Sequence, residues 1–135
     1  MSERVVVGID VQPIDEVEVS LNSFGNRYRH LLFTDNELEY CGDNPATASR
    51  LAARFAAKEA VLKILNVGES VPSWRSIEVQ RTNDGRPEIV LHDEAAALAR
   101  REGIRDLSVS LSHAGGIATA AVVATVNLKT GKSHQ

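Results

Sequence analysis

The feature that most constrains the fold is an alanine-rich segment, LAARFAAKEAVLKIL, which runs from Leu51 to Leu65. Alanine and leucine favour helix, so the segment predicts one long helix from about Ala46 to Asn66. The many alanines leave little side-chain bulk, so neighbouring backbones can approach this helix closely. Four larger apolar side chains fall within about 80° of one another on a helical wheel and should face the core: Leu51, Phe55, Leu62 and Leu65.

The same segment carries charges that a buried helix does not need. Lys58 falls inside the apolar stripe, Arg54 and Glu59 border it, and Lys63 lies one turn further on. A buried ammonium without a partner costs free energy, and the spacing of Arg50, Arg54 and Lys58 brings like charges together. A bound anion would reverse both penalties. Alternatively, Lys58 reaches past the stripe to water, and Glu59 forms an ordinary ion pair with Lys63.

The remaining segments predict short strands and helices around this helix. Their order is strand 4–9, helix 13–24, helix 34–41 with a capping box, then, after the long helix, strand 76–82, strand 88–92, helix 93–103, strand 106–113 and strand 117–126. The first strand is expected to be buried on both faces. This mixture of helices and hairpins predicts an α+β fold with an antiparallel-rich sheet packed on the long helix. We expect one domain over residues 1–126 and a polar tail over 127–135.

Composition excludes several classes of protein. A net charge of −3 and an aromatic content of 4% argue against a nucleic-acid partner. Cys41 is the single cysteine, so an internal disulfide and a cysteine zinc cluster are excluded. The apolar run near the amino terminus is too short for a signal peptide or a membrane span. We therefore expect a soluble cytoplasmic protein without a membrane partner.

An aspartate follows the first apolar run, in VVVGID. Asp10 is expected at the end of that strand, and Gly8 leaves the adjacent backbone open to close approach. Together with Glu59 on the long helix, Asp10 would supply the one or two carboxylates that Mg²⁺ typically takes from a protein. A divalent cation beside the helix's basic residues suits transfer chemistry at a pyrophosphate. The alternative is that Asp10 caps the helix that begins at Pro13.

Three segments together resemble a known family. They are GID after the first strand, LAARFAAKEAVLKIL, and SVSLSHAGGIATAAVV near the end of the chain. In this order they resemble the holo-acyl-carrier-protein synthase group of 4′-phosphopantetheinyl transferases, in its short, single-domain form. The resemblance implies the fold of that family and a homotrimer with active sites between subunits. It also implies Mg²⁺-dependent transfer of 4′-phosphopantetheine from coenzyme A to a serine of an apo acyl carrier protein, with release of 3′,5′-ADP.

The resemblance assigns roles to individual residues. Asp10 and Glu59 match magnesium ligands, and Glu59 is expected to deprotonate the carrier serine. Lys58 matches a lysine that neutralises or protonates the leaving phosphate. Positions expected to contact coenzyme A are Arg54, Lys63, Gly85, Arg86, Pro87 and His113. A histidine at a strand end also suits a purely structural hydrogen bond, so both roles stay open for His113.

The chain departs from the family pattern at three places. Gln12 stands where longer relatives place a third metal-binding acid, so water is expected to complete the shell. The first helix carries Asp15, Glu16 and Glu18 where arginines are usual, which predicts a carrier protein with a less acidic surface. In the loop after the long helix only Gly68 remains of a glycine-rich pattern. These departures keep two other hypotheses open: a non-catalytic module that binds coenzyme A or a nucleotide, and a structural oligomeric domain.

Overall fold

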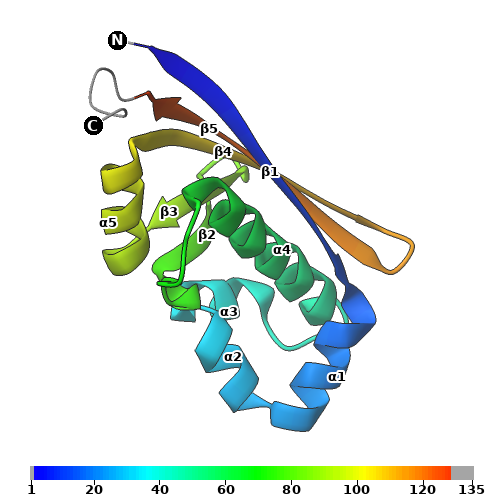
Figure 1. The fold of residues 1–135 in the computed structure, drawn as a ribbon. Coiled ribbons are helices and arrows are strands. Elements are labelled where there is room, and N and C mark those ends of the chain that lie inside the picture. The colour runs from blue at the N-terminus through cyan, green and yellow to red at the C-terminus, as the bar shows by residue number, and fades with distance from the viewer. Residues whose placement is uncertain (1, 129–135) are drawn as a thin grey trace.

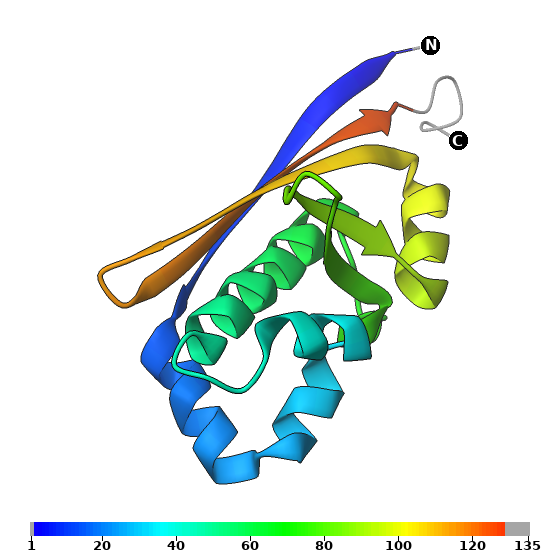
Figure 2. The ribbon, with the colours of Figure 1, turned by 180° about the vertical axis from the view of Figure 1, so that it is seen from behind.

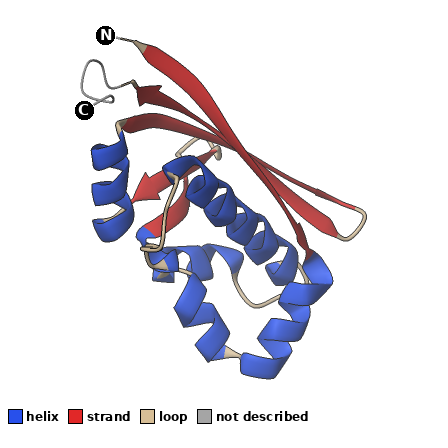
Figure 3. Ribbon diagram, viewed as in Figure 1, coloured by secondary structure: helices blue, strands red, loops and turns tan. Residues whose placement is uncertain are grey.

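The computed structural model describes residues 2–128 as an α+β fold (Figures 1 and 3). The elements follow one another as β1 (Glu3–Pro13), α1 (Ile14–Phe24), α2 (Asn26–Leu32), α3 (Asp35–Cys41), α4 (Thr47–Leu65), a 3₁₀ turn η1 (Trp74–Ser76), β2 (Ile77–Arg81), β3 (Pro87–Leu91), α5 (Asp93–Glu102), β4 (Ile104–Ala114) and β5 (Ile117–Asn127). No helix within residues 2–128 is both long and apolar enough to cross a membrane.

Two antiparallel sheets pack against the long helix α4. The larger sheet has the strand order β1-β5-β4, and β2 and β3 form a separate hairpin. Figure 1 shows α4 lying along the larger sheet, with α1 to α3 at one end of the molecule and α5 at the other. Seen from behind, in Figure 2, the β2–β3 hairpin lies beside β4. The predicted fold class and the packing of an antiparallel sheet on α4 are confirmed.

Helix α4 is buried on nearly every side, which a single apolar stripe does not predict. Phe55 and Leu62 of the stripe are only partly buried, whereas the alanines between them are buried. The physical reason is that α4 contacts the larger sheet on one side and α3 and β2 on another. The expected close approach is confirmed at Gly8, where an added Cβ would lie 2.3 Å from the carbonyl oxygen of Ala60.

Strand β1 differs from its prediction in two respects. It continues to Pro13, so Asp10 lies within the strand rather than at its end. The strand is also buried on one face only. The side chains on its other face are 51–64% exposed: Val5, Val7, Ile9 and Val11. The expectation of burial on both faces is therefore wrong for the single chain. Strand side chains alternate between faces, and α4 covers only the face that carries Gly8 and Asp10.

Local signals placed most other boundaries correctly. Thr34 and Glu37 form the predicted capping box of α3, and α5 stops at Gly103, whose φ of 73° is left-handed. Helix α2 has no counterpart in the prediction, because its seven residues bury only Leu32 and show no periodic apolar pattern. The predicted tail begins at Asn127, which still belongs to β5, and the rest of it from residue 129 lies outside the described residues.

Candidate active site

A carboxylate pair lies where β1 packs against α4. Asp10 shares the α4-facing side of β1 with Gly8, and Glu59 immediately precedes Ala60, the contact point of Gly8 on the helix. Lys63 lies beside the pair, because its ammonium donates to a carboxylate oxygen of Asp10 at 3.1 Å and to the carbonyl oxygen of Ile9 at 2.7 Å. We call Asp10 and Glu59 the acid pair.

The charge of Asp10 acts on Glu59. Partial burial raises the pKa of Glu59 above its ordinary value, repulsion from Asp10 raises it further, and the Lys63 ammonium opposes both effects. Lys63 bonds to Asp10 and, among residues 2–128, forms no ion pair with Glu59, so the alternative of an ordinary i, i+4 pair is wrong. The capping alternative for Asp10 is also wrong, because α1 is capped by Pro13 without a side-chain hydrogen bond.

The acid pair suits a hard divalent cation. Two neighbouring carboxylates, one with a raised pKa, are stabilised by a positive charge placed between them. Within residues 2–128 no third histidine, cysteine or acid gathers with them into a metal-binding cluster. Mg²⁺ commonly takes one or two protein carboxylates and completes its octahedron with water and substrate phosphates, so two acids are sufficient.

Lys58 does not lie at the acid pair. Its side chain is fully buried, and its ammonium contacts the Glu37 carboxylate at 2.9 Å and donates to the carbonyl oxygens of Trp74, at 3.1 Å, and Ile77. Burial lowers the pKa of Lys58, and the charge of Glu37 opposes that shift. The alternative that Lys58 reaches water is wrong. Its expected role at a leaving phosphate does not fit this enclosed position, so we interpret Lys58 as a structural residue that holds α4 against α3 and β2.

Arg54 also points away from the acid pair. Its guanidinium lies over the ring of Tyr40, 4.5 Å from the centroid, and its side chain is 1% exposed. The five residue steps from Arg54 to Glu59 turn an ideal helix by roughly 140° beyond a full turn, which places the two side chains on different sides of α4. Arg54 and Lys63, which the resemblance assigns together to coenzyme A phosphates, therefore face different surroundings in one chain.

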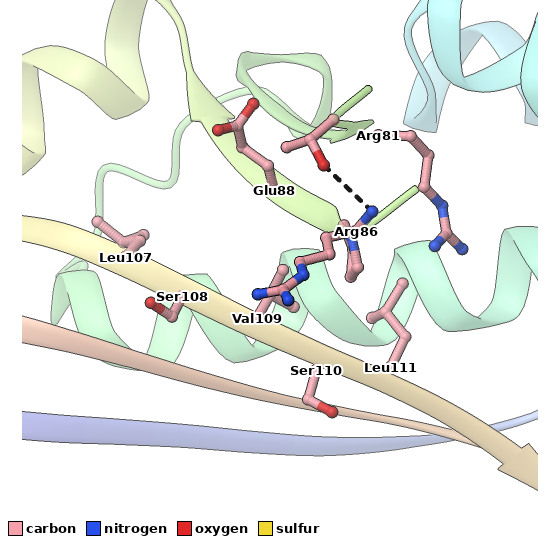
Figure 4. A pocket seen from close by; sticks show the side chains of 10 residues that line it. Arg81, Arg86, Glu88, Leu107, Ser108, Val109, Ser110 and Leu111 are labelled. Atoms are coloured by element: carbon pink, nitrogen blue, oxygen red, sulfur yellow. Dashed lines mark hydrogen bonds between the residues drawn. The ribbon is translucent and has the colours of Figure 1, made fainter. Parts of the chain in front are cut away.

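A second part of the candidate site lies between the β2–β3 hairpin and β4. It is a cavity of about 530 Å³ that we call the hairpin cavity (Figure 4). Arg86 and Pro87 line it as expected, whereas Gly85 forms the turn beside it with a left-handed φ of 87°. His113 does not line this cavity; it is exposed near the end of β4. The remaining lining residues are Arg81, Thr82, Glu88 and five consecutive residues of β4, 107–111.

The acid pair and the hairpin cavity lie at opposite edges of the larger sheet. Asp10 belongs to β1, the cavity lies along β4, and β5 runs between them. Two strand spacings separate the edges by about 10 Å. Neither carboxylate of the acid pair lines the cavity. One chain therefore presents two half-sites that do not meet within it.

Some lining residues had only weak signals in the sequence. Ser108 and Ser110 alternate with apolar residues in DLSVSLSH, a pattern typical of any half-exposed strand. Arg81 ends β2 and gives no signal at all. Their position beside Arg86 depends on the packing of the hairpin against β4, which links residues distant in sequence.

Comparison with known proteins decides the family. Residues 6–122 match the family model of the 4′-phosphopantetheinyl transferase superfamily. The chain belongs to this superfamily. A holo-[acyl-carrier-protein] synthase of Moorella thermoacetica is 43% identical over 116 residues, covering 84% of this chain and 88% of the relative.

Solved structures of this superfamily share the fold. The Helicobacter pylori holo-[acyl-carrier-protein] synthase in complex with coenzyme A has a TM-score of 0.77 and 31% identity, over 88% of this chain and 99% of that one. The ACPS–CoA complex of Chronobacterium ammoniagenes has a TM-score of 0.80 and 26% identity, over 93% of this chain and 99% of that one. The predicted family and fold are thus confirmed.

Proposed function

We propose that this chain is a holo-[acyl-carrier-protein] synthase. It transfers 4′-phosphopantetheine from coenzyme A to a serine of an apo acyl carrier protein and releases 3′,5′-ADP. The observation that carries the proposal is the acid pair with Lys63 beside it, in a chain that belongs to the 4′-phosphopantetheinyl transferase superfamily. The cytoplasmic location expected from the sequence stays a prediction.

The acid pair supports a general-base mechanism. Asp10 and Glu59 would hold Mg²⁺, which would supply positive charge against the pyrophosphate. Glu59 accepts the proton of the carrier serine as the general base. The serine oxygen forms a bond to the β-phosphorus, and the bond from that phosphorus to the bridging oxygen breaks. The leaving 3′,5′-ADP takes that electron pair, and Lys63 stabilises its negative charge.

The hairpin cavity is proposed as the site of the nucleotide. Its volume of about 530 Å³ lies within the range of small-molecule sites, and its lining combines the polar hairpin residues Arg81, Thr82 and Arg86 with residues 107–111 of β4. Arg86 points its guanidinium over β4, where it would meet a phosphate (Figure 4). Arg86 pairs with Asp84 at 3.3 Å at the exposed tip of the hairpin, a contact that an incoming phosphate can replace.

We infer that the complete site forms between copies of the chain. The homotrimer that the resemblance implies would bring such copies together. The two half-sites lie at opposite sheet edges, so the β1 edge of one copy can meet the β4 edge of the next. Repeated head-to-tail contacts of this kind form a ring when the rotation between neighbouring copies closes, as it would in a trimer. The exposed row of Val5, Val7, Ile9 and Val11 on β1 continues onto β5 at Val123, which is 39% exposed. An apolar sheet face of this kind suits burial against other subunits.

The carrier protein is proposed to have a less acidic surface than is usual. The first turn of α1 holds Asp15 and Glu16 and its last turn holds no basic residue, so this helix repels an acidic partner. The neighbouring surface of α1 and α2 exposes apolar side chains instead, with Phe24 at 59% and Leu31 at 68%. We expect carrier recognition to depend on apolar contact and to change little with salt.

The direct test is to incubate the protein with coenzyme A, MgCl₂ and a panel of apo carrier proteins. Intact-mass spectrometry of the carrier should show one phosphopantetheine adduct on the modified serine. Glu59→Gln should abolish the adduct, because the amide cannot accept the serine proton, whereas Glu69→Gln in the exposed loop should not. Absence of an adduct on every carrier, with coenzyme A still bound, would instead support the non-catalytic module.

A complementation experiment tests the shared site. Glu59→Gln disables one half-site and Arg86→Ala the other, so each variant alone should be inactive or weakly active. Co-expressed chains would form mixed oligomers in which some interfaces combine two intact half-sites, and activity should return. If the complete site instead lies within one chain, every site in the mixture carries a defect and no activity returns.

A further inference from the structure

Strand β4 contains a backbone conformation that a regular strand does not need. Asp106 has a φ of 58°, in the left-handed region, which glycine adopts freely and other residues adopt at a cost. Its carboxylate pairs with the guanidinium of the neighbouring Arg105, and both side chains are exposed. Exposed ion pairs contribute little to stability, so this pair does not account for the strained backbone.

The pairing of β4 with β5 shows what Asp106 does. Two residues of β4, Asp106 and Leu107, stand opposite a single residue of β5, Ala124. The pairs on either side of them are Arg105 with Thr125 and Ser108 with Val123. This arrangement is a β-bulge whose first residue is left-handed, a position usually taken by glycine. Asp106 is therefore the extra residue of a bulge in β4.

The bulge changes which side chains of β4 face the core. Ile104 is 8% exposed, and in a regular strand residues 106, 108 and 110 would share its face. The extra residue instead turns Leu107, Val109 and Leu111 inward, where they pack against buried residues of α4 and β5. Beyond the bulge the strand alternates regularly, and the serines at positions 108 and 110 are exposed.

The bulge borders the hairpin cavity. Residues 107–111, which begin directly after Asp106, form one wall of that cavity, and Arg86 of the hairpin reaches over this wall (Figure 4). A bulge bends its strand and increases the local twist. Figure 2 shows β4 curving where it leaves α5, next to the position of the bulge. The direction in which β4 passes the hairpin therefore depends on Asp106.

We propose that Asp106 is a positioning residue for the nucleotide. Its bulge sets the bend of β4 that shapes the hairpin cavity, and Asp106 itself does not line that cavity. The inference rests on the proposed function, in which the cavity holds the nucleotide. Strained backbone conformations cluster at binding and active sites, where the strain holds a useful geometry. The left-handed backbone of Asp106, rather than its charge, is the property that acts.

Substitutions that keep or disfavour the left-handed backbone separate conformation from charge. Asp106→Asn and Asp106→Gly remove the charge and adopt this conformation readily, so isothermal titration calorimetry with 3′,5′-ADP should give the wild-type affinity. Asp106→Val disfavours the conformation and should weaken binding about tenfold or more. Ser112→Val, at an exposed position in the regular part of β4, should bind as the wild type does. Equal affinities of the valine and glycine variants at position 106 overturn the proposal, and so does a loss of affinity in all three variants.

Deletion of Asp106 removes the bulge without changing which residues face the core. Leu107 then follows Ile104 at a spacing of two, so the protein should still fold, as checked by circular dichroism, while its affinity for 3′,5′-ADP falls about tenfold or more. Deletion of Ser110 from the regular part turns Leu111 outward instead and should lower the unfolding temperature further. A folded Asp106 deletion with wild-type affinity overturns the proposal, and the substitutions decide the question if the deletion does not fold.

Steady-state kinetics distinguish positioning from a loss of stability. Asp106→Val should raise the KM for coenzyme A about tenfold and leave kcat nearly unchanged, because it leaves the acid pair and Lys63 in place. A variant that only loses stability has fewer active molecules, which lowers kcat and leaves KM unchanged; that result would contradict the positioning role. If the wild type binds 3′,5′-ADP but modifies no carrier, the transferase proposal fails while the calorimetry still tests the bulge. A wild type that does not bind 3′,5′-ADP overturns this inference together with the nucleotide site.

Discussion

The buried ion pair between Lys58 and Glu37 gives the sharpest prediction for stability. Both side chains are fully buried, 2.9 Å apart. Glu37 also accepts hydrogen bonds from the backbone N–H of Thr34, at 2.9 Å, and Val79, at 2.8 Å. Removing either partner leaves an uncompensated charge in the core, whereas removing both leaves none.

The hydrogen bonds that remain after each substitution determine how much stability is lost. Breaking a buried pair by removing one partner typically costs about 3–5 kcal/mol. Lys58→Met leaves Glu37 with two backbone donors, which favours the lower end, so we expect a loss of about 3 kcal/mol. Glu37→Gln leaves Lys58 with two carbonyl acceptors, and we expect a loss of about 2 kcal/mol. Independent effects would sum to about 5 kcal/mol, but the double variant should lose only about 2–3 kcal/mol.

Equilibrium urea unfolding at fixed protein concentration measures these values. With a denaturant dependence of about 2 kcal/mol per molar urea, Lys58→Met should lower the midpoint by about 1.5 M. Lys63→Met is the comparison, because the Lys63 side chain is 56% exposed and its ion pair contributes less than about 1 kcal/mol. Additive losses in the double variant, or a loss below about 1 kcal/mol for Lys58→Met, would refute the structural role of this pair.

Three further predictions concern the site and the sheet. In the protein without Mg²⁺, the titration midpoint of the Glu59 carboxylate, followed by NMR, should lie above that of an ordinary glutamate, because burial and the charge of Asp10 raise its pKa; Lys63→Gln should move this midpoint higher still, since Lys63 lowers that pKa. Gly8→Ala should lower the thermal unfolding temperature, because the new Cβ would lie 2.3 Å from a carbonyl oxygen of α4. The expected loss in the free energy of unfolding is about 1–3 kcal/mol. Gly68→Ala, with open space around it, should have little effect. Val7→Lys, on the exposed face of β1, should reduce the sedimentation coefficient from that of an oligomer toward that of a single chain.

Each of these predictions has a clear contrary result. A Glu59 midpoint that Lys63→Gln leaves unmoved would mean that the Lys63 charge does not act on this carboxylate. Equal unfolding temperatures for the two glycine variants would mean that β1 can shift away from α4. Unchanged sedimentation of Val7→Lys would place the subunit contact elsewhere than on this face of the sheet.

Much of the site was predictable because its residues belong to strong local patterns. The alanine-rich segment predicts α4 and therefore the position of Glu59 along it. Asp10 follows an apolar β-branched run, which predicts a strand, and Gly8 predicts its close approach to a neighbour. Only the end of that strand was misplaced, because β1 pairs with β5 as far as Pro13 and long-range pairing has no local signal.

The charged residues of α4 show the limit of such patterns. Lys58, Glu59 and Lys63 are close in sequence, yet Lys58 pairs with Glu37 of α3 and Lys63 pairs with Asp10 of β1. A helical wheel gives the direction of each side chain but not the element that it meets. The buried role of Lys58 and the position of Arg54 over the Tyr40 ring depend on partners from other elements.

The sequence alone therefore determined the helix, the strands, the two carboxylates and the family, because each rests on local propensity or on a continuous motif. Only the tertiary structure decided which lysine accompanies the acids, which one is enclosed in the core, and that the two half-sites face opposite edges of the sheet. The physical reason is that charge pairing and burial are set by contacts between distant segments, which periodicity within one segment does not record.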